Sequence, residues 1–216
     1  MSSETNALSA AMQRCGLIAI LRGVTPDAVV PIGHALVEAG FSIIEVPLNS
    51  PEPLKSIRAL RDALPASCLV GAGTVTRVQD CADVAAAGGQ IVVMPHSDAA
   101  VIRAAKAAGL WCAPGVATLT EAYAALAAGA DVLKLFPAEA LSPAVLKAWR
   151  AVLRPPVALV PVGGIVPASV AAYAAAGASG FGLGSALYRS GDSAADVARQ
   201  AAAFMQAWNS SYNTSL

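Results

Sequence analysis

The sequence predicts an α/β fold: a single (β/α)8 (TIM) barrel with a short extra helix at its N-terminal end. A repeating unit runs through almost the whole chain, in which an alanine-rich helical stretch ends at glycine, a short apolar run follows, and Ser or Thr opens the next helix. Eight apolar runs occur at even spacing, with no clear reversal point. An open doubly wound sheet is the alternative, but its edge strands should be more polar, and none of these runs clearly is.

The apolar runs, the glycines and the Ser or Thr residues predict where each element begins and ends. Strands are predicted at about residues 17–22, 42–47, 68–72, 91–94, 110–114, 131–136, 157–162 and 180–184. Helix ends are predicted at Gly40, Gly88, Gly109, Gly129 and Gly177. Helix starts are predicted at Thr25-Pro26, Ser50-Pro51, Thr76, Ser97, Thr118, Ser142-Pro143 and Ser193. Thr118 and Glu121 also have the spacing of a capping box.

The chain of 216 residues is long enough for one domain with a sizeable core. Residues 1–15 are interpreted as an N-terminal helical extension that could cover the barrel floor. Residues 16–208 are expected to form the barrel, the domain in which a catalytic site would lie, and residues 209–216 to form a polar tail that frays.

The composition excludes several classes of function. Hydrophobic residues make up 56% of the chain, but prolines and glycines break the uncharged run at 155–188, so no membrane span is expected. The 14 basic and 14 acidic residues balance, which leaves no electrostatic footprint for nucleic acid. The first residues lack the basic-then-apolar order of a signal peptide, which predicts a cytoplasmic protein. The four cysteines show no metal-type spacing and are expected to be reduced core residues.

One predicted strand carries a lysine. In the run from Asp131 to Pro137, period-two alternation places Val132, Lys134 and Phe136 on one face, and both faces are otherwise apolar. A buried ammonium responds by a lowered pKa, and a neutral amine can attack a carbonyl to form a Schiff base. The plain alternative is a lysine that reaches solvent from the end of a strand.

Two further charged residues occupy similar positions. Arg22 ends the first predicted strand and Glu45 lies in the second. Because catalytic groups of a barrel gather at the carboxyl ends of its strands, Arg22, Glu45 and Lys134 should converge on one small volume. A carboxylate beside a desolvated lysine can move protons while an imine forms and collapses. A structural ion-pair cluster would explain the same three residues.

Glycines follow the last two predicted strands. The runs Val162-Gly163-Gly164-Ile165 and Gly182-Leu183-Gly184-Ser185 lie where barrel enzymes often bind phosphate through backbone N–H groups. These glycines could also serve only to permit tight turns. The two histidines, His34 and His96, are far apart in the sequence, and no cluster resembles a metal site.

Taken together and in order, the motifs resemble a family, the class I 2-dehydro-3-deoxy-phosphogluconate and -phosphogalactonate aldolases. The matching pieces are Ile18-Ala19-Ile20-Leu21-Arg22-Gly23, Ile44-Glu45-Val46-Pro47-Leu48-Asn49-Ser50-Pro51, Gly71-Ala72-Gly73-Thr74-Val75, Pro114-Gly115, Thr118, Leu133-Lys134-Leu135-Phe136-Pro137, Val162-Gly163-Gly164-Ile165 and Gly184-Ser185. The chain departs from the family pattern at Met94-Pro95-His96, where a small or hydroxyl residue, then Pro with Asn or Gly, is more usual.

The resemblance implies a role for each matching residue. Lys134 would be the Schiff-base lysine and Glu45 the general acid/base. Substrate-binding positions would be Arg22, Thr74, Pro95 and Phe136. Phosphate-binding positions would be Gly163, Gly164, Gly184 and Ser185. It further implies an enzyme without metal or cofactor, commonly a homotrimer.

The implied activity is retro-aldol cleavage of 2-dehydro-3-deoxy-6-phosphogalactonate to pyruvate and D-glyceraldehyde 3-phosphate, in sugar-acid catabolism. The segment around Asn49 resembles the phosphogalactonate branch, and we expect this amide to face the substrate hydroxyls and set the preferred epimer; alternatively, it only caps the next helix. Three other functions stay open: cleavage of the gluconate epimer or of both, a barrel isomerase or synthase acting without an imine, and a phosphosugar-binding module.

Overall fold

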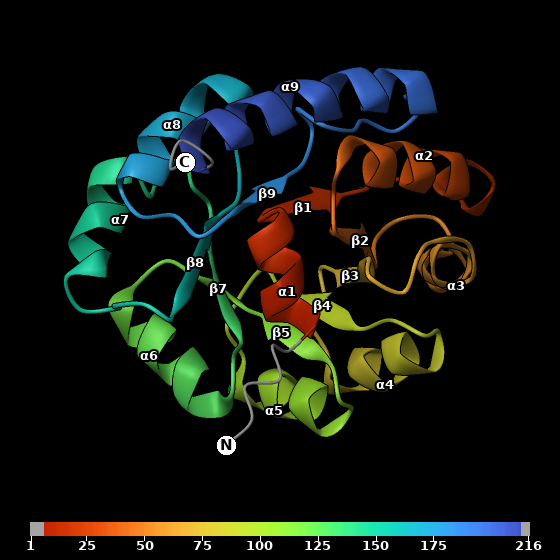
Figure 1. Cartoon of the computed structure of the whole chain (residues 1–216). Coiled ribbons are helices and arrows are strands. Elements are labelled where there is room, and N and C mark those ends of the chain that lie inside the picture. The colour runs from red at the N-terminus through yellow and green to blue at the C-terminus, as the bar shows by residue number, and fades with distance from the viewer. Residues whose placement is uncertain (1–6, 213–216) are drawn as a thin grey trace.

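The computed structural model describes residues 7–212, which form an α/β fold of parallel strands surrounded by helices (Figure 1). The helices are α1 (Ala7–Arg14), α2 (Pro26–Ala39), α3 (Pro53–Ala63), α4 (Val78–Ala86), α5 (Ala99–Ala107), α6 (Leu119–Ala128), α7 (Pro143–Arg150), α8 (Pro167–Ala175) and α9 (Ala194–Tyr212). The strands are β1 (Leu17–Ile20), β2 (Ile43–Pro47), β3 (Leu69–Gly73), β4 (Ile91–Val93), β5 (Trp111–Ala113), β6 (Gly115–Val116), β7 (Val132–Leu135), β8 (Ala158–Pro161) and β9 (Phe181–Leu183).

The strands fall into two parallel sheets. A curled six-stranded sheet has the order β5-β4-β3-β2-β1-β9, and a three-stranded sheet has the order β6-β7-β8. The predicted fifth strand, 110–114, corresponds to β5, and the chain continues after Pro114 as an additional short strand, β6, in the other sheet. Pro114 has no N–H to donate to a ladder. The two sheets stay connected there, because the carbonyls of Cys112 and Pro114 accept hydrogen bonds from Asp131 N and Lys134 N. On the other side, a bridge between Val162 and Gly182 links β8 with β9.

Two apolar clusters fill the protein. The larger one lies between the strands and the helices that surround them. The smaller one lies on the inner faces of the strands and includes Ile43 of β2 and Val132 of β7. Because side chains on a strand alternate, Glu45 and Lys134, two residues further on, continue the same inner faces toward the carboxyl ends of the strands.

Helix α1 lies across the opposite, amino end of the strands (Figure 1). Its buried residues Leu8 and Ala11 join the inner cluster and so cover that cluster at the amino end of the strands. Residues 1–6 of the predicted extension lie outside the described part of the chain.

Glycines end several helices as predicted. Gly40 and Gly129 follow α2 and α6 with φ angles of 106° and 105°, in the left-handed region that glycine adopts without strain. Thr118 and Glu121 form the predicted capping box of α6. The helix start at Ser50-Pro51 is wrong: α3 begins at Pro53, and the Ser50 hydroxyl accepts a hydrogen bond from Gly23 N.

The last helix is longer than expected. Helix α9 continues through Tyr212, four residues into the segment predicted as a polar tail. The Tyr212 ring stacks on Trp208 with a centroid distance of 3.9 Å, and its hydroxyl donates to the carbonyl of Ala178. Aromatic packing therefore holds this turn in place, and residues 213–216 of the tail lie outside the described region.

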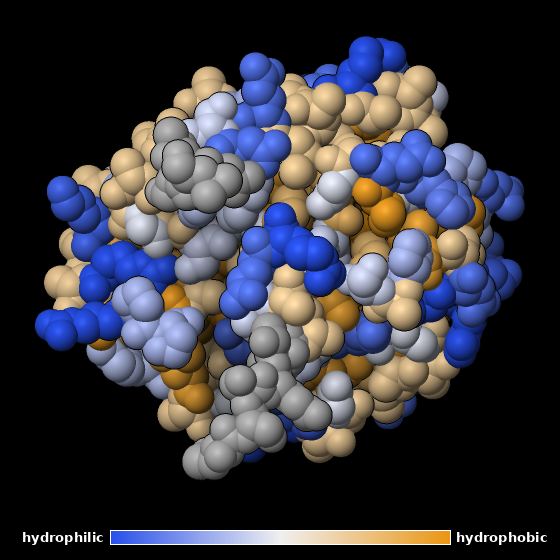
Figure 2. All heavy atoms as spheres, viewed as in Figure 1, coloured by the Kyte–Doolittle hydropathy of each residue, from blue (hydrophilic) through white to orange (hydrophobic). Residues whose placement is uncertain are grey.

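The high apolar content does not produce a membrane span: between residues 7 and 212, no helix is long and apolar enough to cross a membrane. On the face that α1 crosses, pale orange and blue atoms are mixed rather than segregated (Figure 2). Within residues 7–212, the large hydrophobic side chains that are exposed are Val78, Tyr123, Val152 and Val166.

Candidate active site

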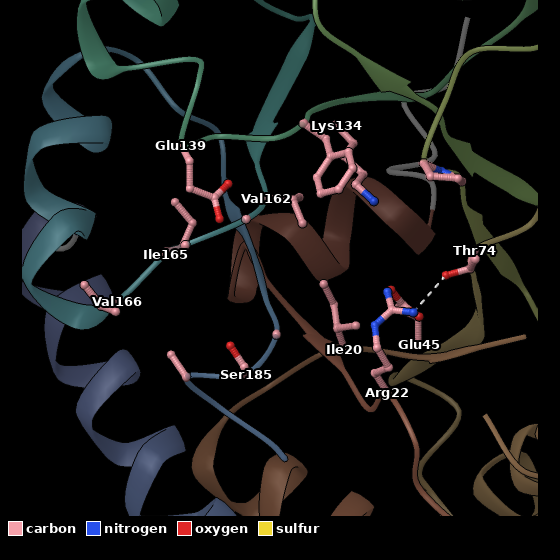
Figure 3. A pocket seen from close by; sticks show the side chains of 16 residues that line it. Ile20, Arg22, Glu45, Thr74, Lys134, Glu139, Val162, Ile165, Val166 and Ser185 are labelled. Atoms are coloured by element: carbon pink, nitrogen blue, oxygen red, sulfur yellow. Dashed lines mark hydrogen bonds between the residues drawn. The ribbon is translucent and has the colours of Figure 1, made fainter. Parts of the chain in front are cut away.

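A cavity of about 380 Å³ opens at the carboxyl ends of the strands (Figure 3). All ten residues to which the resemblance assigned catalytic, substrate-binding or phosphate-binding positions line it: Arg22, Glu45, Thr74, Pro95, Lys134, Phe136, Gly163, Gly164, Gly184 and Ser185. Glu45 and Lys134 are buried at its base, whereas Arg22, Gly164 and Ser185 are exposed. The cavity therefore has a desolvated floor and an open, glycine-lined side.

Lys134 supplies an amine at the floor. Only 8% of this residue is exposed, and its Nζ lies 4.4 Å from the centroid of the Phe136 ring. Burial lowers the pKa of Lys134, because the charged form loses water; Glu45 opposes this effect and Arg22 adds to it. A lowered pKa enlarges the fraction of neutral, nucleophilic amine near neutral pH.

Glu45 supplies the carboxyl group beside it. The residue is 2% exposed, and its Oε2 finds no hydrogen-bond partner in the described part of the chain. Burial raises the pKa of Glu45 to about 7, although the positive charges of Lys134 and Arg22 pull it down. A carboxyl group with such a pKa can both accept and release a proton near neutrality.

Gly73 makes room for this carboxylate. A Cβ at Gly73, the last residue of β3, would overlap Glu45 Oε2. The close approach of the carboxylate to β3 therefore requires glycine at this position.

Three polar side chains meet where β1, β2 and β3 end. Arg22 Nη1 donates to Asn49 Oδ1 at 2.7 Å. It also donates to Thr74 Oγ1 at 3.4 Å (Figure 3). Thr74 has a φ of 56°, which is strained for a β-branched residue. Asn49 lines a neighbouring hollow that shares Thr74 with the main cavity, so that it faces the substrate stays a prediction. The alternative, that Asn49 caps α3, is wrong, because α3 begins at Pro53 with Glu52 as its N-cap.

The opposite side of the cavity consists of the loops after β8 and β9. Gly163 and Gly164 have φ angles of 108° and 63°, which glycine alone adopts easily. Ser185 adds a hydroxyl group, and Figure 3 shows it across the cavity from Lys134. Backbone N–H groups beside such glycines are suited to bind an anion.

Six further residues line the cavity that the sequence did not single out: Ile20, Glu139, Val162, Ile165, Val166 and Ala186. Glu139 is the one that carries a charge. It lies on the loop after β7, five residues beyond Lys134, and this position at the carboxyl end of a strand was the available signal.

Neither histidine lines the cavity; both are exposed, and the His96 carbonyl accepts a hydrogen bond from Gly115 N. In the described residues, no three His, Cys, Asp or Glu side chains gather in a way that could hold a metal ion.

Comparison with known proteins gives a consistent picture. Residues 8–202 match the family model described as "KDPG and KHG aldolase". The chain is 46% identical to the 2-dehydro-3-deoxy-6-phosphogalactonate aldolase of Escherichia coli (strain K12), over 89% of this chain and 94% of the relative. It is 47% identical to a probable enzyme of the same name from Rhizobium meliloti (strain 1021), over 91% and 92% of the two chains. A solved structure described as native KDPGal superimposes with a TM-score of 0.89 at 45% identity and covers 91% of this chain and 96% of the other.

Proposed function

Because the chain belongs to the KDPG and KHG aldolase family, we propose that its cavity cleaves 2-dehydro-3-deoxy-6-phosphogalactonate to pyruvate and D-glyceraldehyde 3-phosphate. As a member of that family the protein is an aldolase, a carbon–carbon lyase. The substrate follows from the names of the two relatives at 46% and 47% identity. The observation that carries the mechanism is the pairing of a buried amine, Lys134, with a buried and unpartnered carboxyl oxygen of Glu45.

Lys134 begins the reaction. Its neutral amine adds to the C2 carbonyl of the substrate, and loss of water gives an iminium ion. The C3–C4 bond then breaks, and its electron pair moves into the iminium to form an enamine. Protonation of the enamine at C3 and hydrolysis of the resulting iminium release pyruvate and restore the amine.

Glu45 moves the protons of these steps. As the C3–C4 bond breaks, the C4 hydroxyl gives its proton to the carboxylate and becomes the aldehyde of the leaving product. The same carboxyl group assists the loss of water during imine formation. A pKa of about 7 suits both directions of transfer.

The rest of the cavity fits the two ends of the substrate. Phe136 lies beside the amine and would pack against the pyruvyl end together with Pro95, which also lines the cavity. Arg22 and Thr74 would contact the substrate carboxylate and hydroxyl groups. The phosphate would bind across the cavity, at Gly163, Gly164, Gly184 and Ser185.

Three features of the whole protein belong to the same proposal. The two sheets form one closed (β/α)8 barrel, an arrangement supported by their links at Pro114 and at the Val162–Gly182 bridge. The enzyme is a homotrimer, consistent with the exposed apolar side chains. It works in the cytoplasm, which is consistent with four free cysteines.

Borohydride trapping tests the mechanism. Reduction in the presence of pyruvate should leave one stable adduct, on the peptide that contains Lys134, and Lys134→Arg should abolish both the adduct and turnover. Exposed Lys147 on α7 is the internal control and should stay unmodified. An adduct on Lys147 instead would remove Lys134 as the Schiff-base residue, and the absence of any adduct would rule out the imine and favour a barrel isomerase or synthase.

A further inference from the structure

Glu139 is a charged residue of the cavity to which the proposed mechanism gives no role. Its side chain extends from the loop after β7 toward the segment around Val162 and Ile165 (Figure 3). It therefore enters the cavity on the side where the proposed function places the phosphate, away from Lys134.

The carboxylate lies directly against the glycine pair. A Cβ at Gly163 would overlap Glu139 Oε2, and a Cβ at Gly164 would lie 2.8 Å from Glu139 Cγ and 3.0 Å from Oε1. Because Gly163 and Gly164 have no side chains, they leave a space that Glu139 fills.

Nothing in the described residues neutralises this charge. Each of the four ion pairs there joins other residues, Lys55 with Glu52, Arg77 with Asp80, Lys106 with Asp131 and Arg199 with Asp196. The side chain is exposed, so water can solvate the carboxylate in other positions as well. An anion arriving at Gly163 and Gly164 would meet an unpaired carboxylate that is able to move away.

We propose that Glu139 is a specificity-determining residue, whose carboxylate occupies the phosphate subsite and must be displaced by every ligand that carries a phosphate group. This inference rests on the proposed function, since it needs a phosphate at Gly163 and Gly164. With Glu139 in this position, the protein should discriminate less strongly between phosphorylated and unphosphorylated substrates than it would with the glycine loops alone. Pyruvate, which reaches only the Lys134 end, is unaffected.

Charge removal at constant shape gives the sharpest test. Two unit charges about 4 Å apart in water repel enough to change an affinity about fivefold, so Glu139→Gln should bind glycerol 3-phosphate and inorganic phosphate about fivefold more tightly. Glu139→Ser, which also empties the space, should bind them at least as tightly. Isothermal titration measures both affinities without turnover.

Activity provides the second readout. In Glu139→Gln the KM of the phosphorylated substrate should fall about as much as the glycerol 3-phosphate Kd, while the KM of its unphosphorylated analogue and the rate of pyruvate trapping stay unchanged. The matched control is Glu38→Gln at the end of α2, which removes the same charge from an exposed residue outside the cavity and should change neither quantity.

Three outcomes would contradict the inference in distinguishable ways. Affinities within about twofold of the parent in both variants would show that Glu139 does not compete. Weaker binding in Glu139→Gln would show that the carboxylate holds a ligand hydroxyl instead. If the parent and both variants bind no phosphate probe and show no preference for the phosphorylated substrate, the phosphate subsite of the proposed function is absent, and this inference fails with it.

Discussion

In the proposed mechanism, Glu45 and Lys134 would each serve catalysis at the expense of stability. Burial raises the pKa of Glu45 and lowers that of Lys134, so each group is held partly against its preferred charge. The same shifts that make the amine nucleophilic and the carboxyl group a proton carrier reduce the free energy of unfolding at neutral pH. Both residues are therefore expected to limit stability.

A stability measurement can show this for Glu45. Its folded-state pKa of about 7 lies above its ordinary value of 4.5, so the unfolded chain releases this proton first, and the parent loses stability as the pH rises between the two values. Glu45→Gln cannot titrate. Relative to the parent, the variant should therefore gain roughly 1–3 kcal/mol between pH 4.5 and pH 8, a few degrees in Tm.

Thermal unfolding across this pH range checks the prediction. Glu38→Gln, an exposed change on α2, is the control and should give a difference that is flat with pH. A flat difference for Glu45→Gln as well would mean that the carboxyl group does not titrate in this range. In the same variant, kcat should fall about 10²–10⁴-fold if Glu45 is the acid/base group.

At the scale of elements, three neighbouring strand ends cooperate. Strands β1, β2 and β3 pair in parallel register, so the residues that follow them, Arg22, Asn49 and Thr74, emerge side by side. Asn49 accepts from Arg22 at 2.7 Å and lies outside the main cavity. We therefore expect Asn49 to act on the substrate through Arg22, as a positioning residue.

Substitution of Asn49 separates positioning from direct contact. Asn49→Ala should free the Arg22 guanidinium and raise KM about threefold to tenfold, with a smaller change in kcat. The same variant should reduce the preference for the galactonate 6-phosphate over the gluconate 6-phosphate. Asn49→Asp keeps the acceptor and should retain most of that preference. The measurement is kcat/KM for both epimers.

The surface amide Gln79, on α4, offers a matched control, since Gln79→Ala should leave both epimers unchanged. Equal effects of Asn49→Ala on both epimers would show that Arg22 needs no support from this residue to select between them. A parent that prefers the gluconate epimer would contradict the proposed substrate itself.

At the scale of the whole molecule, much of the arrangement followed from the sequence. Buried parallel strands are apolar on both faces, so the polar exceptions, Glu45 and Lys134, were conspicuous, and the barrel topology was enough to place them together. Each predicted strand overlaps an observed one. The strands and helices could be predicted because their signals are local: glycine at the ends of helices and period-two alternation in the strands.

The remainder depended on contacts between distant segments. Ser50 resembles a helix cap, but its hydroxyl is used by Gly23 N, 27 residues earlier. The Asn49 amide oxygen is bonded to Arg22, also 27 residues earlier. In the sequence, Glu139 resembles an ordinary solvated loop residue, and only the fold places it against Gly163 and Gly164. No local pattern encodes these pairings.

The assembly proposed above also has a direct measurement. Sedimentation equilibrium should give three times the 21.6 kDa mass of one chain. Charged substitutions at exposed Val78 or Tyr123, which are 52% and 51% accessible, would identify which surface the subunits share, because only a buried interface position would lower the mass. A monomeric mass for the parent would overturn the trimer.

The amino ends of the strands are covered by helices, whereas the carboxyl ends carry the cavity. Helix α1 covers the amino end, and α9 finishes at Tyr212 beside Ala178, which leads into β9 at that same end. The cavity opens at the carboxyl end. A tag, an immobilisation linker or a second enzyme fused beyond either helix should therefore lie on the side of the molecule opposite the cavity. The cavity opening would stay accessible, so that substrate can diffuse in and products can diffuse out.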